Sequence, residues 1–127
     1  MAHTLTAEGI TLKVASTCDD VGVQQSGSLV RKASTLNHRI EVKGADRAER
    51  THALVMTNNA ALKLTMTGTQ PVQVYGHQAQ GASNSQLLNM RKNLKNTTEF
   101  AGSFACSATV LSYRFGPNGD PFVRCPP

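Results

Sequence analysis

The feature that most constrains this chain is the repeated alternation of apolar and polar residues between Leu29 and His77. Successive side chains of a β-strand point to opposite faces of a sheet, so this alternation is typical of half-buried strands. Turn-forming residues interrupt it at positions 44–46, 58–59 and 68–71. The pattern predicts an antiparallel meander with these strands: Leu36 to Lys43, Glu49 to Thr57, Ala61 to Thr67 and Val72 to His77.

The N-terminal residues predict a β-hairpin ahead of the meander. Thr4 to Ala7 and Ile10 to Ala15 alternate on either side of Glu8-Gly9, and glycine suits a tight turn. Residues 16–28 carry turn formers and little periodicity, which indicates a loop or an irregular edge strand. Residues 1–17 contain no unbroken hydrophobic run, so we expect neither a signal peptide nor a membrane span, and we expect synthesis in a cytoplasm.

Helix signals replace strand signals after His77. Ser83 and Gln86 have the spacing of a capping box. The apolar residues that follow share one helical face: Leu87, Met90 and Leu94. A first C-terminal helix is therefore predicted here, with cations in its last turn.

A second start signal at Asn96, with Glu99 three residues later, predicts a shorter helix that runs to about Ala108. We expect an extended segment at Thr109 to Phe115 and an irregular tail at residues 116–127.

Strands first and helices last predict an α+β fold. We expect an N-terminal hairpin and an antiparallel meander sheet, followed by two C-terminal helices packed on one sheet face. The 127 residues have room for one domain, so residues 1–127 are predicted to share one core. Open sheet edges invite pairing, and we therefore expect a homodimer formed through edge strands.

The chain carries 13 Lys and Arg against 8 Asp and Glu, a formal net charge of +5. One face of the predicted sheet is polar and basic and holds one aromatic ring. Cations contact phosphates, hydroxyls contact base edges and rings stack on bases, so this face predicts RNA binding. The alternative is an ordinary solvated sheet face. The predicted RNA-binding residues are Arg39, Lys43, Thr51, Lys63, Thr65, Gln73, Tyr75 and His77.

Residues for catalysis, metal binding or cofactor binding do not converge. A small ribonuclease would need an acid–base pair and a phosphate clamp. Its candidates are His38, Arg39, Glu41 and His77. His38 and Glu41 have opposite strand parity, however, so they would face opposite sides of the sheet. The glycine-rich segments lack the strand–glycine–helix context of nucleotide sites, and the four histidines lack metal-ligand spacing. We expect no enzyme activity, no cofactor and no metal.

Three cysteines without a C-x-x-C spacing indicate neither a closed disulfide framework nor a zinc site. Cys106 falls among apolar residues of the second predicted helix, so we expect it to be buried and reduced. Cys18 and Cys125 are expected to be exposed. An intersubunit disulfide between Cys18 and Cys125 and a pair of unpaired surface thiols are both open.

The layout resembles the coat proteins of single-stranded RNA bacteriophages, the levivirus-like group. The likeness lies in the hairpin, the meander within TLNHRIEVKGADRAERTHALVMT, and the helix that opens at ASNSQLLNMRKNLKN. The resemblance implies a subunit that dimerises and assembles into an icosahedral shell around its RNA genome, as part of a virion. It also implies that the inner sheet face binds RNA, including an operator hairpin. By position, the nearest candidates are Thr51, Lys63, Thr65 and Tyr75.

Two other functions stay open. A free cytoplasmic RNA-binding module would bind RNA as a monomer or dimer and would never form shells. A small ribonuclease would turn over single-stranded RNA. Electron microscopy separates the coat function from both, because only a coat protein forms regular hollow particles.

Overall fold

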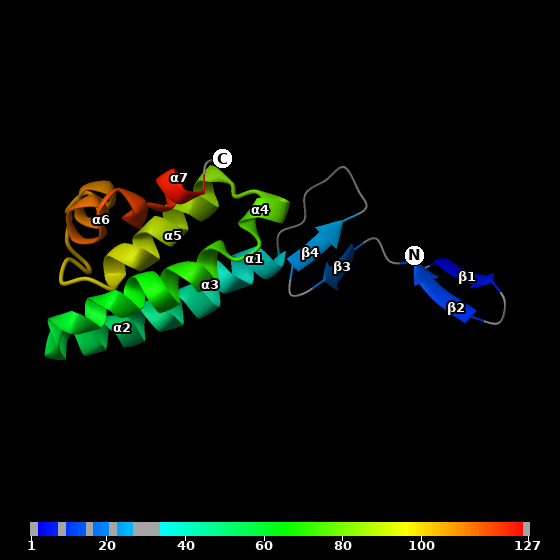
Figure 1. Cartoon of the computed structure of the whole chain (residues 1–127), viewed down its shortest axis with the longest axis horizontal. Coiled ribbons are helices and arrows are strands. Elements are labelled where there is room, and N and C mark those ends of the chain that lie inside the picture. Colours follow the sequence, from blue (N-terminus) through cyan, green and yellow to red (C-terminus); the bar gives the residue numbers. More distant parts are fainter. Residues whose placement is uncertain (1–2, 8–9, 15–16, 21–22, 27–33, 126–127) are drawn as a thin grey trace.

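Helices dominate the chain from Ser34 onward in a computed structural model (Figure 1). Two short antiparallel hairpins precede them, β1 with β2 and β3 with β4. Their strands are β1 (His3–Ala7), β2 (Ile10–Val14), β3 (Thr17–Asp20) and β4 (Val23–Ser26). The first hairpin lies where the alternation around Glu8-Gly9 predicts one. The structure describes residues 3–7, 10–14, 17–20, 23–26 and 34–125.

The predicted meander sheet, and with it the α+β fold class, is wrong. Residues 34–57 form one long helix, because the residues at the junctions between its segments all have α-helical φ and ψ. We call residues 34–57 the first arm. Its segments are α1 (Ser34–His38), the π-helical η1 (Arg39–Gly44) and α2 (Ala45–Thr57).

The chain then turns back, and residues 59–74 run as a second arm beside the first (Figure 1). The segments of this second arm are the 3-10 turn η2 (Asn59–Leu62), the π-helical η3 (Thr65–Thr69) and α3 (Gln70–Val74). Because α3 packs on η1 and η3 packs on α2, the two arms are antiparallel. The segment is therefore a helical hairpin where the sequence predicts strands.

Of the predicted turns inside this segment, the one at Asn58-Asn59 is confirmed. Asn58 is extended, with φ −145° and ψ 113°, and its Oδ1 accepts a hydrogen bond from the Ala60 N–H at 2.9 Å. This is the geometry of a helix N-cap. The turns predicted around Gly44 and Gly68 are wrong, since both glycines lie inside π-helical segments.

Small and polar side chains hold the arms together. Gly44 faces Gln73, and a Cβ at position 44 would lie 2.7 Å from Gln73 Cγ, so only glycine allows this approach. Thr51 and Thr69 place their hydroxyl oxygens 3.5 Å apart, and the Gln73 amide donates to the Thr69 carbonyl at 3.3 Å. The contact surface of the two arms is thus largely polar.

The helix predicted after Ser83 is confirmed as α5 (Asn84–Asn96). The Ser83 side chain accepts from the Gln86 N–H, and the Gln86 side chain accepts from the Ser83 N–H, which completes the predicted capping box. The predicted apolar face is also confirmed, because Leu87, Met90 and Leu94 are all buried. α5 packs on both arms. The main core cluster consists of Leu36, Ile40, Val74, Ala82, Leu87, Met90 and Cys125.

The second predicted helix, Asn96 to Ala108, is wrong. The Thr97 and Thr98 hydroxyls donate back to the carbonyls of Leu94 and Lys95, and this competition with the backbone ends α5. A loop follows, which the buried Lys95 holds by donating to the carbonyls of Ser103 and Ala105 at 2.6 and 2.8 Å. The next helix, α6 (Ser107–Phe115), occupies the segment predicted to be extended.

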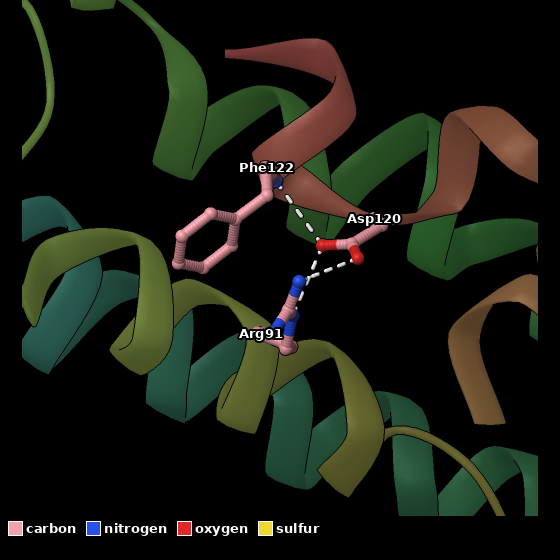
Figure 2. A network of polar contacts seen from close by, with 3 residues as sticks. All are labelled: Arg91, Asp120 and Phe122. Atoms are coloured by element: carbon pink, nitrogen blue, oxygen red, sulfur yellow. Dashed lines mark hydrogen bonds and ion pairs between the residues drawn. The ribbon is translucent and has the colours of Figure 1, made fainter. Parts of the chain in front are cut away.

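The tail folds back onto the core instead of remaining irregular. It contains η4 (Pro117–Gly119) and α7 (Pro121–Arg124). Arg91 of α5 donates to both carboxylate oxygens of Asp120, at 3.0 and 2.6 Å (Figure 2). The Arg91 guanidinium also lies over the Phe122 ring, 4.2 Å from its centroid. These contacts fasten α7, and Cys125 behind it is fully buried.

We expect Gly44→Ala to lower the free energy of unfolding by about 1 kcal/mol, and by no more than about 2 kcal/mol. Overpacking typically costs about 1–3 kcal/mol, which exceeds the gain of roughly 1 kcal/mol from replacing glycine in a helix. Gly68→Ala is the matched control, because a Cβ there meets nothing within 4 Å. Urea denaturation should show the control as stable as the parent or more stable. Equal effects of the two substitutions would contradict the close contact between the arms.

We expect Asp120→Asn to lower the free energy of unfolding by roughly 1–3 kcal/mol, because the half-buried Arg91 loses its ionic partner. Asparagine still caps α7, so the change tests the charge. The control is Asp46→Asn, which breaks the exposed Asp46–Arg50 pair. Exposed pairs contribute about 0.2–1 kcal/mol. A larger loss in the control than in Asp120→Asn would refute the importance of the tail contact.

Candidate nucleic-acid interface

One face of the helical hairpin carries a hollow of about 350 Å³ between the two arms. Three cations from the first arm line it: Arg39, Lys43 and Arg47. The second arm and the turn that follows it contribute Thr67, Gly68, Pro71, Val72 and Tyr75. No acidic side chain lines this hollow, which we call the basic groove, so its electrostatic potential favours anions.

The cations of the basic groove recur every four residues, and residues at this spacing share one side of a helix. Two of them reach across to the second arm or to the turn that follows it. The Arg39 guanidinium donates to the Tyr75 carbonyl at 3.1 Å and lies 4.6 Å from the centroid of the Tyr75 ring. Arg47 donates to the Gly68 carbonyl at 3.2 Å. Exposed Lys43 lies between them in the sequence.

Tyr75 adds a flat surface to this row of charge. The residue is 47% exposed, so part of it is open to a ligand. Phosphates are bound by rows of Lys and Arg, and unpaired bases stack on aromatic rings. The arrangement can therefore bind the backbone of a nucleic acid and stack a base beside it.

The structure brings together Arg39, Lys43 and Tyr75 from the residues predicted to bind RNA. His77 lines a hollow that adjoins the groove. Lys63 is exposed but does not line the groove.

Thr51, Thr65 and Gln73 take other positions from those expected on an open sheet face. All three are buried, at 6%, 0% and 1% exposure. They lie between helices, where the Thr65 hydroxyl donates to Thr97 Oγ1 at 2.8 Å and Gln73 accepts from Asn93 at 3.3 Å. Their role in this fold is packing, and they cannot reach an RNA ligand.

Sequence reasoning missed Arg47. A signal was present, because Arg39, Lys43 and Arg47 follow one another at intervals of four. In a helix that spacing places all three on one side, but the predicted meander leaves Arg47 between the strands that end at Lys43 and begin at Glu49, so it is assigned to no face.

A larger hollow, of about 480 Å³, lies between α2, α5 and the loop after α5. Glu49 and Lys92 both line it, so it carries opposite charges. His52 lines it too, and its Nδ1 donates to the Thr98 carbonyl at 3.1 Å. Balanced charge suits a polyanion less well than the basic groove does.

The burial of Cys106 and of Cys125 is the reverse of the prediction. Cys106, expected to be buried, is exposed at the start of α6, and hydrogen bonds from the backbone and side chain of Thr109 lower the pKa of its thiol. Cys125, expected to be exposed, is buried, and burial raises the pKa of its thiol. A disulfide from Cys125 to Cys18 of another subunit would require the tail to leave the core. The Cys18 side chain lies outside the described part.

Comparison of the chain with models of protein families, with curated proteins and with solved structures found no match. In the described part of the chain, no helix is long and apolar enough to cross a membrane. Nor do the described residues contain a group of three or more His, Cys, Asp or Glu side chains placed to hold a metal ion.

In a folded Cys18→Ser variant, we expect the Cys106 thiol to be alkylated quickly and the Cys125 thiol to be protected from alkylation. Thiolate is the reactive form, so the lowered pKa of Cys106 favours alkylation at neutral pH, and the rate should begin to rise at lower pH than for an ordinary thiol. Buried Cys125 should react only after unfolding. Mass spectrometry after brief iodoacetamide treatment identifies the labelled residue. Preferential labelling of Cys125 in the folded protein would contradict its place in the core.

Proposed function

We propose that this chain binds single-stranded or looped RNA through the basic groove, without catalysing a reaction. The observation that carries the proposal is the row of Arg39, Lys43 and Arg47 beside Tyr75, a residue that is about half exposed. Sequence-independent affinity for nucleic acid comes mainly from cations placed along phosphates. A tyrosine beside them supplies the stacking surface that unpaired bases use.

We further propose that this contact serves to package an RNA genome. The resemblance to bacteriophage coat proteins implies this role, and of the parts that carry the resemblance the N-terminal hairpin and α5 are present while the meander is not. Packaging requires phosphate contacts and little sequence readout, which the basic groove can supply. The groove takes the place of the predicted sheet face as the RNA contact. Dimerisation through edge strands of a meander is not part of this proposal, because residues 36–77 form helices and turns and no strand.

Exposed apolar side chains support self-association as part of the same proposal. Leu54, Met56, Leu64 and Phe104 are 52%, 67%, 45% and 108% exposed. Contiguous apolar patches mark contacts between proteins, and in the proposed shell neighbouring copies of the chain would cover these exposed side chains.

We expect Lys43→Ala and Arg47→Ala each to weaken RNA binding and to reduce the slope of log K against log salt by about 0.7–1. The loss should be similar for different RNA sequences, because phosphate contacts carry no sequence information. Fluorescence anisotropy at several salt concentrations measures the slope. Lys92→Ala is the control, since it removes the same charge from α5, outside the groove. Unchanged slopes in both groove variants would refute the groove as the RNA contact.

Electron microscopy of the purified protein with RNA tests the packaging role separately. Regular particles are expected, and fewer of them with the groove variants. A small monodisperse species that still binds RNA would identify a free RNA-binding module instead. Cleavage of the RNA during the binding assay would contradict a non-catalytic function.

A further inference from the structure

A second hollow, of about 490 Å³, adjoins the basic groove at Tyr75. The two hollows share Pro71 and Tyr75 as lining residues, so they meet at this part of the chain. The second hollow is otherwise lined by Val74, Gly76, His77, Gln78, Ala79 and Arg124. Arg124 belongs to α7, so the tail forms one wall.

The second hollow holds groups that suit RNA. The Arg124 guanidinium donates to Gln70 Oε1 at 2.8 Å, which holds this exposed cation against the second arm. His77 Nδ1 lies 2.7 Å from the Val74 carbonyl and must donate to it, because a carbonyl only accepts. In the neutral ring, His77 Nε2 is then an acceptor, which suits a ribose hydroxyl or a base N–H.

The backbone turns where the two hollows meet. Tyr75 is extended, and Gly76 follows with φ +83°, a left-handed conformation that favours glycine. A Cβ at position 76 would also lie 3.0 Å from Val23 Cγ2. A ligand that follows both hollows must pass the Tyr75 ring at this turn. A single strand can bend there and stack a base on the ring, whereas the bases of a duplex are already stacked and paired.

We propose that the two hollows form one track for a single strand of RNA, with Tyr75 as the stacking surface in the middle and Arg124 as the phosphate contact at the tail end. This inference rests on the proposed function and adds to it the strandedness of the ligand and a role for the tail. The Arg91–Asp120 pair then has a functional consequence, because it fastens the helix that carries Arg124 (Figure 2).

The test compares oligonucleotides of two lengths, about four and about ten nucleotides of mixed-sequence RNA, a range that spans common single-strand site sizes. The short oligonucleotide is expected to occupy the basic groove, where the cations are most numerous. Arg124→Gln should weaken binding of the long oligonucleotide by roughly three- to tenfold and leave the short one nearly unchanged. Arg124→Lys keeps the charge and should restore most of the lost affinity. Lys92→Gln is the control and should change neither.

Three results would overturn the track. They are an unchanged affinity of Arg124→Gln for the long RNA, an equal loss for both lengths, or equal affinity of the parent protein for a duplex of the same length. In each case Arg47→Gln should still weaken both oligonucleotides if the proposed function holds. Loss of the Arg124 effect alone therefore refutes the track, and failure of the parent protein to bind any RNA refutes the proposed function. Circular dichroism of each variant establishes that it is folded.

Discussion

The close contact between the two helical arms is the constraint on which the rest of the molecule depends. Gly44 lets the Gln73 side chain lie directly against the first arm, and the Thr51 and Thr69 hydroxyls meet farther along the same seam. The amide of Gln73 and the two threonine hydroxyls are polar groups, which are costly to bury unless they are hydrogen-bonded. Asn93 of α5 meets part of that need, because its amide donates to the Ile40 carbonyl at 2.7 Å and to the Gln73 side chain at 3.3 Å. One side chain thus joins three helices.

Both arms contain a π-helical segment at this seam, η1 in the first and η3 in the second. A π-helical segment disturbs the regular hydrogen-bond ladder, and it persists where other groups bind the backbone atoms that are released. The Asn93 amide donates to the carbonyl of Ile40, which lies within η1. Pro71 follows η3 and has no N–H to continue the ladder. The groove thus lies beside the irregular part of both helices, where Arg39, Lys43 and Tyr75 come together.

Two pairs of cations have different roles in the structure. Arg91 and Lys95 belong to α5 and bind carboxylate or carbonyl oxygens, which fastens the tail and the loop after α5. Arg39 and Arg47 also bind carbonyls across the seam, but they line an open hollow as well. Holding a guanidinium in place before a ligand arrives reduces the entropy lost on binding. The same contacts that join the arms would therefore preorganise the groove for the phosphates of the proposed RNA ligand.

The sequence by itself determined α5, its capping box, its buried face and the reversal at Asn58, because each depends on neighbours within four residues. It also established a basic net charge, from which RNA binding is predicted, and supplied Arg39, Lys43 and Tyr75 as candidates. It could not determine the helical hairpin. The buried positions of the second arm are almost all polar: Thr65, Thr69, Gln70, Gln73 and Val74. Hydrophobic periodicity is invisible there, and the many threonines and valines favour strands. Only tertiary contacts made these segments helices, because a polar seam becomes favourable once its partners close over it, and those partners lie 18 to 53 residues apart in the chain.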